Sequence, residues 1–247
     1  MITVESVALQ YPSLTRVPTA IFDAVTSWGL ASLNRRILSQ FRQPSGWAGH
    51  LVGGIMTLEH APVTAWMLDL LQPRAGERVL DAGCGSGQAL RAMARRMEMG
   101  EWAGIDYSAT MVAQARRRNR KLIAAGRCRI EQADIAALPF ADATFDKIST
   151  IETLYFWPDP AAAFAELRRV LKPAGRLAAV LEYTREGNDA AQMELLEQQG
   201  GLRVYSQSQV EALFRNAGFV DVKASFVAEK GWLYVEGTRP TATANAR

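Results

Sequence analysis

The 247-residue sequence contains very little cysteine and histidine, which limits the chemistry open to it. There are two cysteines, Cys84 and Cys128, and two histidines, His50 and His60. Two thiols cannot build a disulfide framework or a cysteine-rich zinc site, and the histidines do not stand at metal-ligand spacing. We therefore expect no metal cofactor and a reducing compartment.

Long apolar runs and a secretory leader are also missing. No stretch approaches the roughly 18–20 apolar residues of a membrane span. The first residues, "MITVESVALQYPSLTRVP", lack a basic segment followed by an apolar core. These absences predict a cytoplasmic protein without membrane insertion. The net charge of +3 is too small to imply a nucleic-acid partner by itself.

The concentrated basic run "RRRNRKLIAAGRCR" lacks the aromatic side chains that would stack on nucleic-acid bases. We therefore predict a solvated helix face, on the side of the sheet away from any ligand pocket, and no nucleic-acid partner. The run contributes Arg116, Arg117, Arg118, Arg120, Lys121, Arg127 and Arg129.

What the sequence does contain is an alternation of strand and helix patterns. Short apolar runs typical of strands occupy 77–83, 102–108, 128–134, 145–152, 176–183, 219–228 and 231–237. Patterns typical of helices occupy 19–41, 59–73, 86–97, 109–126, 159–175 and 206–218. Such alternation predicts parallel βαβ units. The expected fold class is α/β, a Rossmann-like doubly wound sheet of about seven mostly parallel strands with a helical N-terminal extension. The last two strands are expected to be neighbours.

The chain divides into three expected regions. Residues 1–74 would form a helical extension, residues 75–238 the core, and residues 239–247 a disordered tail. The two helices of the extension are joined by the glycine-rich stretch "PSGWAGHLVGG". They would make either a lid over the site or an arm for a homodimer, and the sequence does not decide between these.

The segment "VLDAGCGSG", Val79 to Gly87, ends the first core strand with three glycines at alternate positions. Glycine allows positive φ and lets backbone N–H groups approach a ligand closely. A dinucleotide loop would have glycine where Gln88 stands, and a P-loop would have a lysine. Asp81 would repel a phosphate but suits a ligand with a cationic amine.

Two further strand ends carry aspartates. Asp106 lies about 20 residues past the glycine loop, where a carboxylate commonly accepts both hydroxyls of a ribose. Its alternative role as a helix N-cap is already filled by Ser108. Asp134 would accept a hydrogen bond from an adenine amino group, with Ile135 and Leu138 beside the ring. Its alternative role is to cap the turn before Pro139.

At this point the chain resembles the class I S-adenosylmethionine-dependent methyltransferases from about Glu77 to Phe219. The matching segments are "VLDAGCGSG", "GIDYSATMVAQA", "ADIAALPFADATFDKI", "LRRVLKPAGRL" and "FRNAGF", in the order of the family. The resemblance implies that the glycines line the methionine moiety, Asp106 holds the ribose and Met111 packs on the adenine; Met111 as an ordinary core residue is the alternative. The implied cofactor is S-adenosylmethionine, with S-adenosylhomocysteine as product. The expected cofactor residues are Asp81, Gly83, Cys84, Gly85, Gly87, Asp106, Tyr107, Met111, Asp134, Ile135 and Ile151.

The fourth strand runs into "IETLYFWPDP", where the acceptor would approach. Enzymes that methylate exocyclic amines of DNA bases carry Asn/Asp-Pro-Pro-Tyr/Phe here, and this sequence does not. The segment "LPFADATFDKI", followed by an aromatic run, resembles instead the subgroup that acts on small molecules such as quinones, sterols and natural products. Aromatic faces at this position stabilise a sulfonium and stack on a planar acceptor. The expected acceptor-binding residues are Tyr155, Trp157, Trp47, Met56 and Trp28, and one of Phe156 and Trp157 is expected to pack on the following helix.

Methyl transfer is an in-line displacement that needs alignment and exclusion of water. An oxygen or carbon acceptor can also need its proton removed. Candidates are Tyr155, Glu152 and His60, with His50 as a further one, and each histidine has an ordinary structural alternative. The expected partner is a small-molecule acceptor methylated on O, N or C. Alternatives are a noncatalytic S-adenosylmethionine-binding protein and an RNA methyltransferase.

Overall fold

The computed structural model describes residues 60–97 and 99–241. Its strands are β1 (Arg78–Ala82), β2 (Glu101–Asp106), β3 (Cys128–Gln132), β4 (Phe145–Ile151), β5 (Leu171–Leu181), β6 (Val220–Val227) and β7 (Trp232–Thr238). Its α-helices are α5 (Ala61–Leu71), α6 (Gln88–Arg96), α7 (Ala109–Arg118), α8 (Arg120–Ala124), α9 (Pro160–Val170), α10 (Ala190–Gly200) and α11 (Gln207–Asn216). None of the helices in these ranges is long and apolar enough to cross a membrane.

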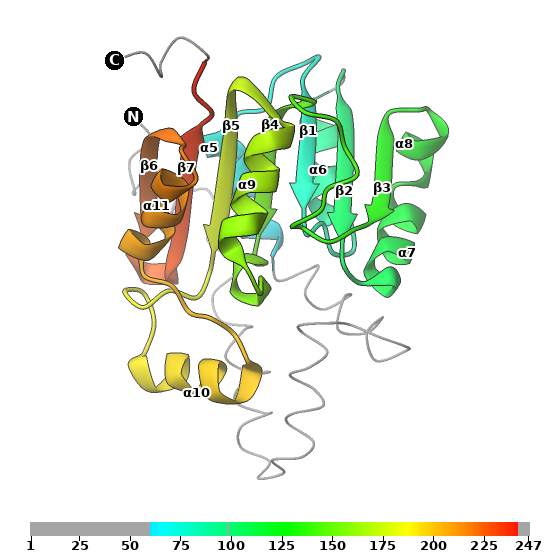
Figure 1. Ribbon diagram of the computed structural model, residues 1–247. Coiled ribbons are helices and arrows are strands. Elements are labelled where there is room, and N and C mark those ends of the chain that lie inside the picture. The colour runs from blue at the N-terminus through cyan, green and yellow to red at the C-terminus, as the bar shows by residue number, and fades with distance from the viewer. Residues whose placement is uncertain (1–59, 98, 242–247) are drawn as a thin grey trace.

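The strands form one seven-stranded sheet in the order β3-β2-β1-β4-β5-β7-β6 (Figure 1). β1 to β5 are parallel, and β7 runs antiparallel between β5 and β6. The chain moves outward from β1 to β3 and then returns to the other side of β1 at β4. Ligands in such sheets bind beyond the carboxyl ends of the strands at this change of direction. The predicted α/β class with about seven mostly parallel strands is confirmed, including the pairing of the last two strands, while residues 1–59 of the expected helical extension lie outside the described residues.

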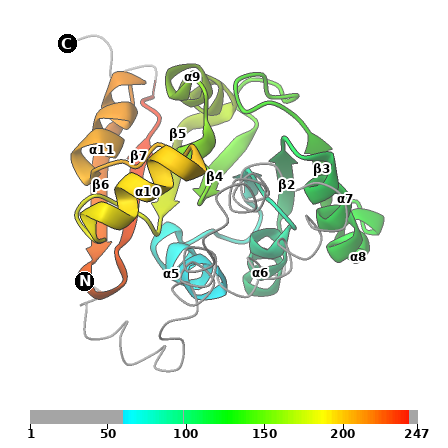
Figure 2. The same cartoon turned by 90° about the horizontal axis from the view of Figure 1, so that it is seen from below.

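Helices cover both faces of the sheet (Figure 2). α9 and α11 lie on one face, where Phe164, Leu167 and Phe214 join one apolar cluster. α5, α6 and α7 lie on the other, and Met67 and Met93 belong to the second cluster. The strands between them are buried on both faces, which explains the nearly continuous apolar run at the end of β5.

Helix α5 is part of this core, although the predicted boundary at residue 74 assigned it to the extension. Its Trp66 ring lies 5.8 Å from the ring of Trp232 and 6.0 Å from that of Tyr234. Val63, Met67 and Leu71 are fully buried in the same cluster. The start of the folded core therefore moves back to at least residue 61, because α5 covers the sheet itself.

The predicted helix at 159–175 is too long at its C-terminus. α9 ends at Val170, and Leu171 already begins β5. The stretch "KPAG" enters the strand through a register shift against β4, which accommodates Pro173 where a regular ladder would need its N–H. Helix α10 was not predicted, and it lies beyond the carboxyl ends of the strands (Figure 1).

The predicted disordered tail also begins too early. The Arg239 guanidinium donates through Nη1 to the carbonyl oxygens of Arg168 and Arg169, both at 2.9 Å, and to that of Leu171. The Arg239 backbone N–H donates to the Gly175 carbonyl at 2.9 Å. Arg239 therefore belongs to the folded core, and residues 242–247 lie outside the described residues.

Candidate active site

The glycine loop joins β1 to α6 at the centre of the carboxyl edge of the sheet. All three glycines have positive φ, +81° at Gly83, +50° at Gly85 and +77° at Gly87. A Cβ at Gly83 would lie 2.3 Å from Thr153 Cγ2, so the turn after β4 packs directly on the loop. A Cβ at Gly85 would meet no atom of residues 60–97 or 99–241 within 4 Å. Gly83 is thus required by packing, and Gly85 faces open space.

Asp106, at the end of β2, holds this loop in place. Its Oδ2 accepts the Gly85 N–H at 2.9 Å, and its Oδ1 accepts the Ser108 N–H at 2.8 Å. Burial raises the pKa of Asp106, while these two N–H groups act to lower it. Each carboxylate oxygen keeps a lone pair for a further donor. Ser108 caps α7 by accepting the Met111 N–H at 3.3 Å, as predicted.

An alanine scan of this loop should separate packing from ligand contact. Gly83→Ala combines an unfavourable φ with a clash against Thr153, so we expect unfolding free energy to fall by about 2–5 kcal/mol. Gly85→Ala has the φ cost alone, about 1–2 kcal/mol, but its Cβ enters the open space and should abolish cofactor binding. Urea unfolding and calorimetric titration measure the two effects. Equal loss of stability in both variants would contradict this division.

Asp81 lies in β1 just before the loop, and Cys84 is the second residue of the loop itself. Asp81 is 2% exposed, and its Oδ1 accepts the Ser149 hydroxyl at 3.1 Å. Burial raises the pKa of Asp81 to about 7, and the Asp106 charge acts in the same direction. Cys84 is also buried, against the backbone of Gly104. This burial places both residues in support of the loop, whereas sequence reasoning expected both of them in contact with the ligand.

The other expected cofactor residues differ in how far they are exposed to solvent. Tyr107 is 64% exposed, whereas Met111 is buried. Ile135 and Ile151 are half-buried. Asp134 is exposed, and its Oδ1 accepts the Ala136 N–H at 2.9 Å, so the turn-capping alternative is realised. Its Oδ2 can still accept from a ligand.

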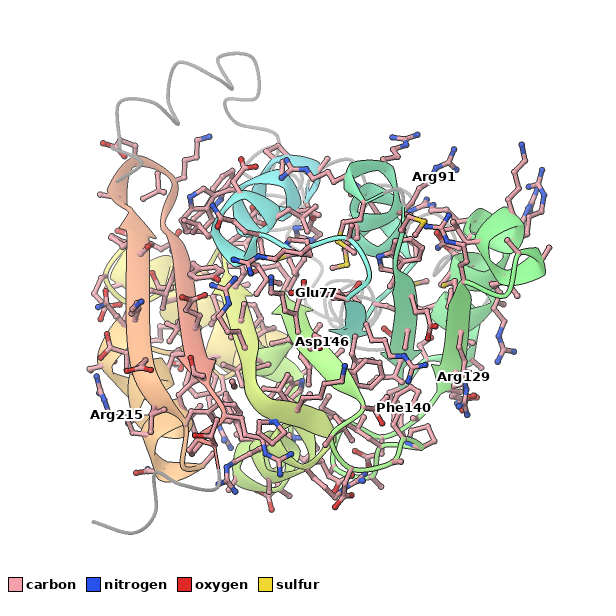
Figure 3. All side chains as sticks on the ribbon, turned by 90° about the horizontal axis from the view of Figure 1, so that it is seen from above. Glu77, Arg91, Arg129, Phe140, Asp146 and Arg215 are labelled. Carbon is pink, nitrogen blue, oxygen red and sulfur yellow. The ribbon has the colours of Figure 1, made fainter. Side chains whose placement is uncertain are left out.

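The basic helix touches the loop, contrary to its predicted position away from the pocket. It is broken at Asn119 into α7 and α8. Arg118 Nη1 donates to Ser86 Oγ at 2.8 Å, and Asn119 Nδ2 donates to the Gly87 carbonyl at 2.9 Å. This end of the basic run therefore braces the glycine loop. Figure 3 shows Arg91 extending from α6 toward the outside of the molecule.

The opposite edge of the sheet, where Figure 3 labels Glu77 and Asp146, carries charges that pair with one another. Lys147 Nζ lies 3.0 Å from Glu77 Oε2, and Lys172 Nζ lies 2.8 Å from both carboxylate oxygens of Asp146. These pairs tie β1, β4 and β5 together at their amino ends. A second group of polar side chains lies at the carboxyl edge, beyond β4.

Beyond β4 the structure brings together three of the predicted catalytic candidates and one residue that was not predicted. Glu152 Oε1 accepts the Tyr155 hydroxyl at 2.9 Å and the Glu182 N–H at 2.5 Å. The Glu182 carboxylate in turn lies 2.5 Å from His60 Nδ1. The Tyr155 hydroxyl accepts the Tyr183 N–H at 2.9 Å. We call His60, Glu152, Tyr155 and Glu182 the β4–β5 polar cluster.

The electrostatics of the β4–β5 polar cluster are unusual. Burial and, to a smaller extent, the neighbouring Glu182 raise the pKa of Glu152 to about 8, although His60 acts to lower it. Glu152 also has a φ of +58°, a conformation that costs a non-glycine residue free energy and occurs often at functional sites. Glu182 was missed because "RLAAVLEY" predicts a buried strand, and only the sheet register shows that its end meets Glu152.

The expected acceptor-binding aromatics differ in exposure. Trp157 is 7% exposed and packs edge-on against Phe164 of α9, with ring centroids 5.7 Å apart. Phe156 is half-buried. Trp157 is therefore the residue of this pair that packs on the following helix. Trp28, Trp47, Met56 and His50 lie outside the described residues.

Removing the Tyr155 hydroxyl should destabilise the cluster. Tyr155→Phe takes one donor from the buried Glu152 carboxylate and removes the acceptor of the half-buried Tyr183 N–H. An unsatisfied buried polar group costs about 1–3 kcal/mol, which urea unfolding would measure as lost unfolding free energy. Tyr107→Phe is the matched control, because that ring is 64% exposed. An equal, negligible effect of both changes would show that the buried hydrogen bonds do not contribute.

Comparison with known proteins agrees with this geometry. Residues 80–179 match the family model described as a methyltransferase domain. The chain is 34% identical over 179 residues to the 27-O-demethylrifamycin SV methyltransferase of Amycolatopsis mediterranei, covering 70% of this chain and 65% of the relative. The chain spans less than two thirds of the length of the curated relatives it matches first.

Solved structures share the fold. One of them is a chain from the complex between the Haloferax volcanii Trm112 methyltransferase activator and a methyltransferase. Its TM-score is 0.68 at 24% identity, and the match covers 79% of this chain and 96% of that one. The Haemonchus contortus phosphoethanolamine N-methyltransferase 2, in complex with S-adenosyl-L-methionine, has a TM-score of 0.64 at 18% identity, covering 74% of this chain and 53% of that one.

The sheet order and the loop after β1 define the Rossmann-like fold that these methyltransferase structures share. Residues 80–179 match the methyltransferase-domain family, and the relatives to which the chain is similar include enzymes of small-molecule methylation. Their cofactor is S-adenosylmethionine. Two observations fit it: the open space over Gly85 and the remaining lone pairs of Asp106.

Proposed function

We propose that the protein transfers a methyl group from S-adenosylmethionine to a small-molecule acceptor. The observation that carries this proposal is the position of Asp106, which braces Gly85 beside open space at the switch between β1 and β4. The ribose hydroxyls would donate to the Asp106 carboxylate, and the methionine moiety would lie along the glycine loop. The sulfonium supplies an activated methyl carbon when the cofactor is bound.

The protein's own contribution on the acceptor side would come from the turn after β4. Thr153 packs on Gly83, so this turn adjoins the cofactor loop. Glu152 and His60 are the candidates to take a proton from an oxygen or carbon acceptor. Tyr155 donates to Glu152 and is 3% exposed, which favours a positioning role over direct contact with the acceptor.

The relatives support a small, planar or apolar acceptor. The Amycolatopsis mediterranei relative acts on 27-O-demethylrifamycin SV, and another, from Roseobacter denitrificans, is a C-methyltransferase of ubiquinone and menaquinone biosynthesis. Nucleic acid is the weaker candidate, since Arg116 and Arg118 of the basic run donate to Ile130 O and Ser86 Oγ within the domain.

The test is methyl transfer from radiolabelled S-adenosylmethionine to a panel of hydroxylated polyketides, quinones and sterols, with total RNA as a further arm. We expect label in an organic-soluble product together with S-adenosylhomocysteine, and no transfer by Asp106→Ala. Cofactor binding without transfer to any acceptor would favour the noncatalytic alternative. Label in RNA that falls with salt would favour the RNA methyltransferase.

Two expectations from the sequence accompany this proposal. We propose a cytoplasmic location, which suits the buried free thiols of Cys84 and Cys128. We also propose that the segment before residue 60 acts as a lid or as the arm of a homodimer. Size-exclusion chromatography with light scattering, on the whole chain and on a version lacking that segment, separates these two roles.

A further inference from the structure

We propose that His60, Glu152 and Glu182 form a binding site for a divalent metal ion at the carboxyl ends of β4 and β5. One potential ligand atom from each of the three side chains lies within 4.8 Å of the others. The sequence predicted no metal, because its spacing rule looks for ligands close together along the chain. Here the histidine and Glu182 are 122 positions apart.

The site is built from rigid elements. Glu152 directly follows β4 and Glu182 directly follows β5, and these neighbouring strands are paired up to Ile151 and Val180. His60 directly precedes α5, which is anchored in the core through Trp66. Three ligands therefore converge from three separately fixed backbones, as metal sites require.

The charge balance favours a cation. Two carboxylates face each other, with Glu152 about nine-tenths buried and the Glu182 side chain 16% exposed. Among residues 60–97 and 99–241, neither glutamate forms an ion pair with a lysine or arginine. Buried carboxylates need a proton or a cation beside them. Without an ion, a proton on Glu152 and the His60–Glu182 pair meet this need. A divalent ion would take their place by neutralising both carboxylates, with His60 as a neutral ligand.

The surrounding hydrogen bonds orient the ligands. Tyr155 and the Glu182 N–H both donate to Glu152 Oε1, which directs that carboxylate and leaves Oε2 for an ion. The Tyr183 N–H fixes the Tyr155 hydroxyl in turn. Outer hydrogen bonds of this kind are a regular feature of metal sites, where they hold the first ligands in position.

The donor set indicates the type of ion. Imidazole suits zinc and iron, whereas carboxylates suit manganese, magnesium and calcium. One nitrogen and two carboxylate ligands therefore favour Mn²⁺, Fe²⁺ or Zn²⁺ over Mg²⁺ and Ca²⁺, which prefer oxygen ligands alone. The competing occupant is a proton shared between His60 Nδ1 and Glu182, 2.5 Å apart.

The position of the site suggests its use. Thr153, next to Glu152, packs on Gly83 of the cofactor loop. An ion here would coordinate an acceptor oxygen beside the cofactor and lower the pKa of its hydroxyl group. This use rests on the proposed function, whereas the metal site itself does not.

The experiment uses the whole, tag-free protein after treatment with a chelator and its removal. Calorimetric titration with Mn²⁺ and Zn²⁺ should give one ion per chain with micromolar affinity, and electron paramagnetic resonance should show bound Mn²⁺. Glu182→Gln and His60→Ala should each weaken binding by about tenfold or more. Glu229→Gln, an exposed glutamate near the end of β6, is the matched control and should bind normally.

Circular dichroism and titration with S-adenosylmethionine on the same samples report folding and the cofactor site separately. A folded protein that binds neither ion would overturn the metal site and leave a proton-sharing network. Binding that both cluster variants retain would also overturn it. Metal binding in a protein that ignores S-adenosylmethionine would uphold the metal site while rejecting the proposed function.

Discussion

Replacing Asp106 with alanine should weaken the binding of S-adenosylmethionine by about tenfold or more, with the protein still folded. A hydrogen bond to a charged group contributes about 1.5–3 kcal/mol, and each 1.4 kcal/mol corresponds to about tenfold in affinity. The variant loses the ribose contacts and also the acceptor that holds the Gly85 N–H at 2.9 Å. Both losses weaken the binding of the cofactor, the first through the ribose and the second through the position of Gly85.

Two further variants make this result specific. Asp106→Asn keeps the size of the side chain and one carbonyl oxygen, so it should show a smaller but clear loss caused by the missing charge. Asp134→Ala removes an exposed carboxylate whose Oδ1 accepts the Ala136 N–H, and it should affect binding least. Calorimetric titration measures all three, and unchanged affinity in a folded Asp106→Ala protein would remove Asp106 from the ribose site.

The stability of the cofactor-free protein should fall as the pH rises from 4 to 8, with Asp81 as a major cause. Its pKa is 3.8 in the unfolded chain and about 7 in the folded protein, because the carboxyl is buried. Below both values the carboxyl is protonated in either state. Between them only the unfolded chain releases its proton, so each pH unit costs about 1.4 kcal/mol. The full cost by pH 8 is about 4 kcal/mol.

Asp81→Asn removes this dependence because its amide does not ionise. Urea unfolding at pH 5 and pH 8 should show the wild type losing about 3 kcal/mol more than the variant between these values. Asp221→Asn changes an exposed aspartate on β6 and should follow the wild-type curve. Parallel curves for wild type and Asp81→Asn would show that the carboxyl is already ionised when folded.

Much of the fold could be predicted from the sequence because its signals are local. Alternating strand and helix patterns gave the layered sheet, and Ser108 marked the start of α7 correctly. The errors arose where tertiary contacts outweigh local preference. "LKPAG" continues a helical pattern, but pairing with β4 draws it into β5. Arg239 follows the last strand, and the hydrogen bonds of its side chain and backbone to the α9–β5 segment hold it in the core.

In the candidate site, too, the sequence predicts the local contacts but not those between residues far apart along the chain. The glycine loop and Asp106 lie within one βαβ unit, so their spacing along the chain already predicts their contact. The β4–β5 polar cluster joins residues that are distant in sequence, and Glu182 became recognisable only through the parallel register. The contact between Arg118 and Ser86 depends on how α7 packs beside the loop, and the composition of the basic run contains no signal for it.

The most direct test asks whether Asp106 and the glycine loop bind S-adenosylmethionine. It is a calorimetric titration of the purified protein with S-adenosylmethionine and S-adenosylhomocysteine, with NAD as control. The geometry of Asp106 and the glycine loop predicts micromolar binding of both S-adenosyl compounds and no heat with NAD. Binding of NAD, or of none of the three, would contradict the assignment of the glycine loop and the methyl-transfer function with it.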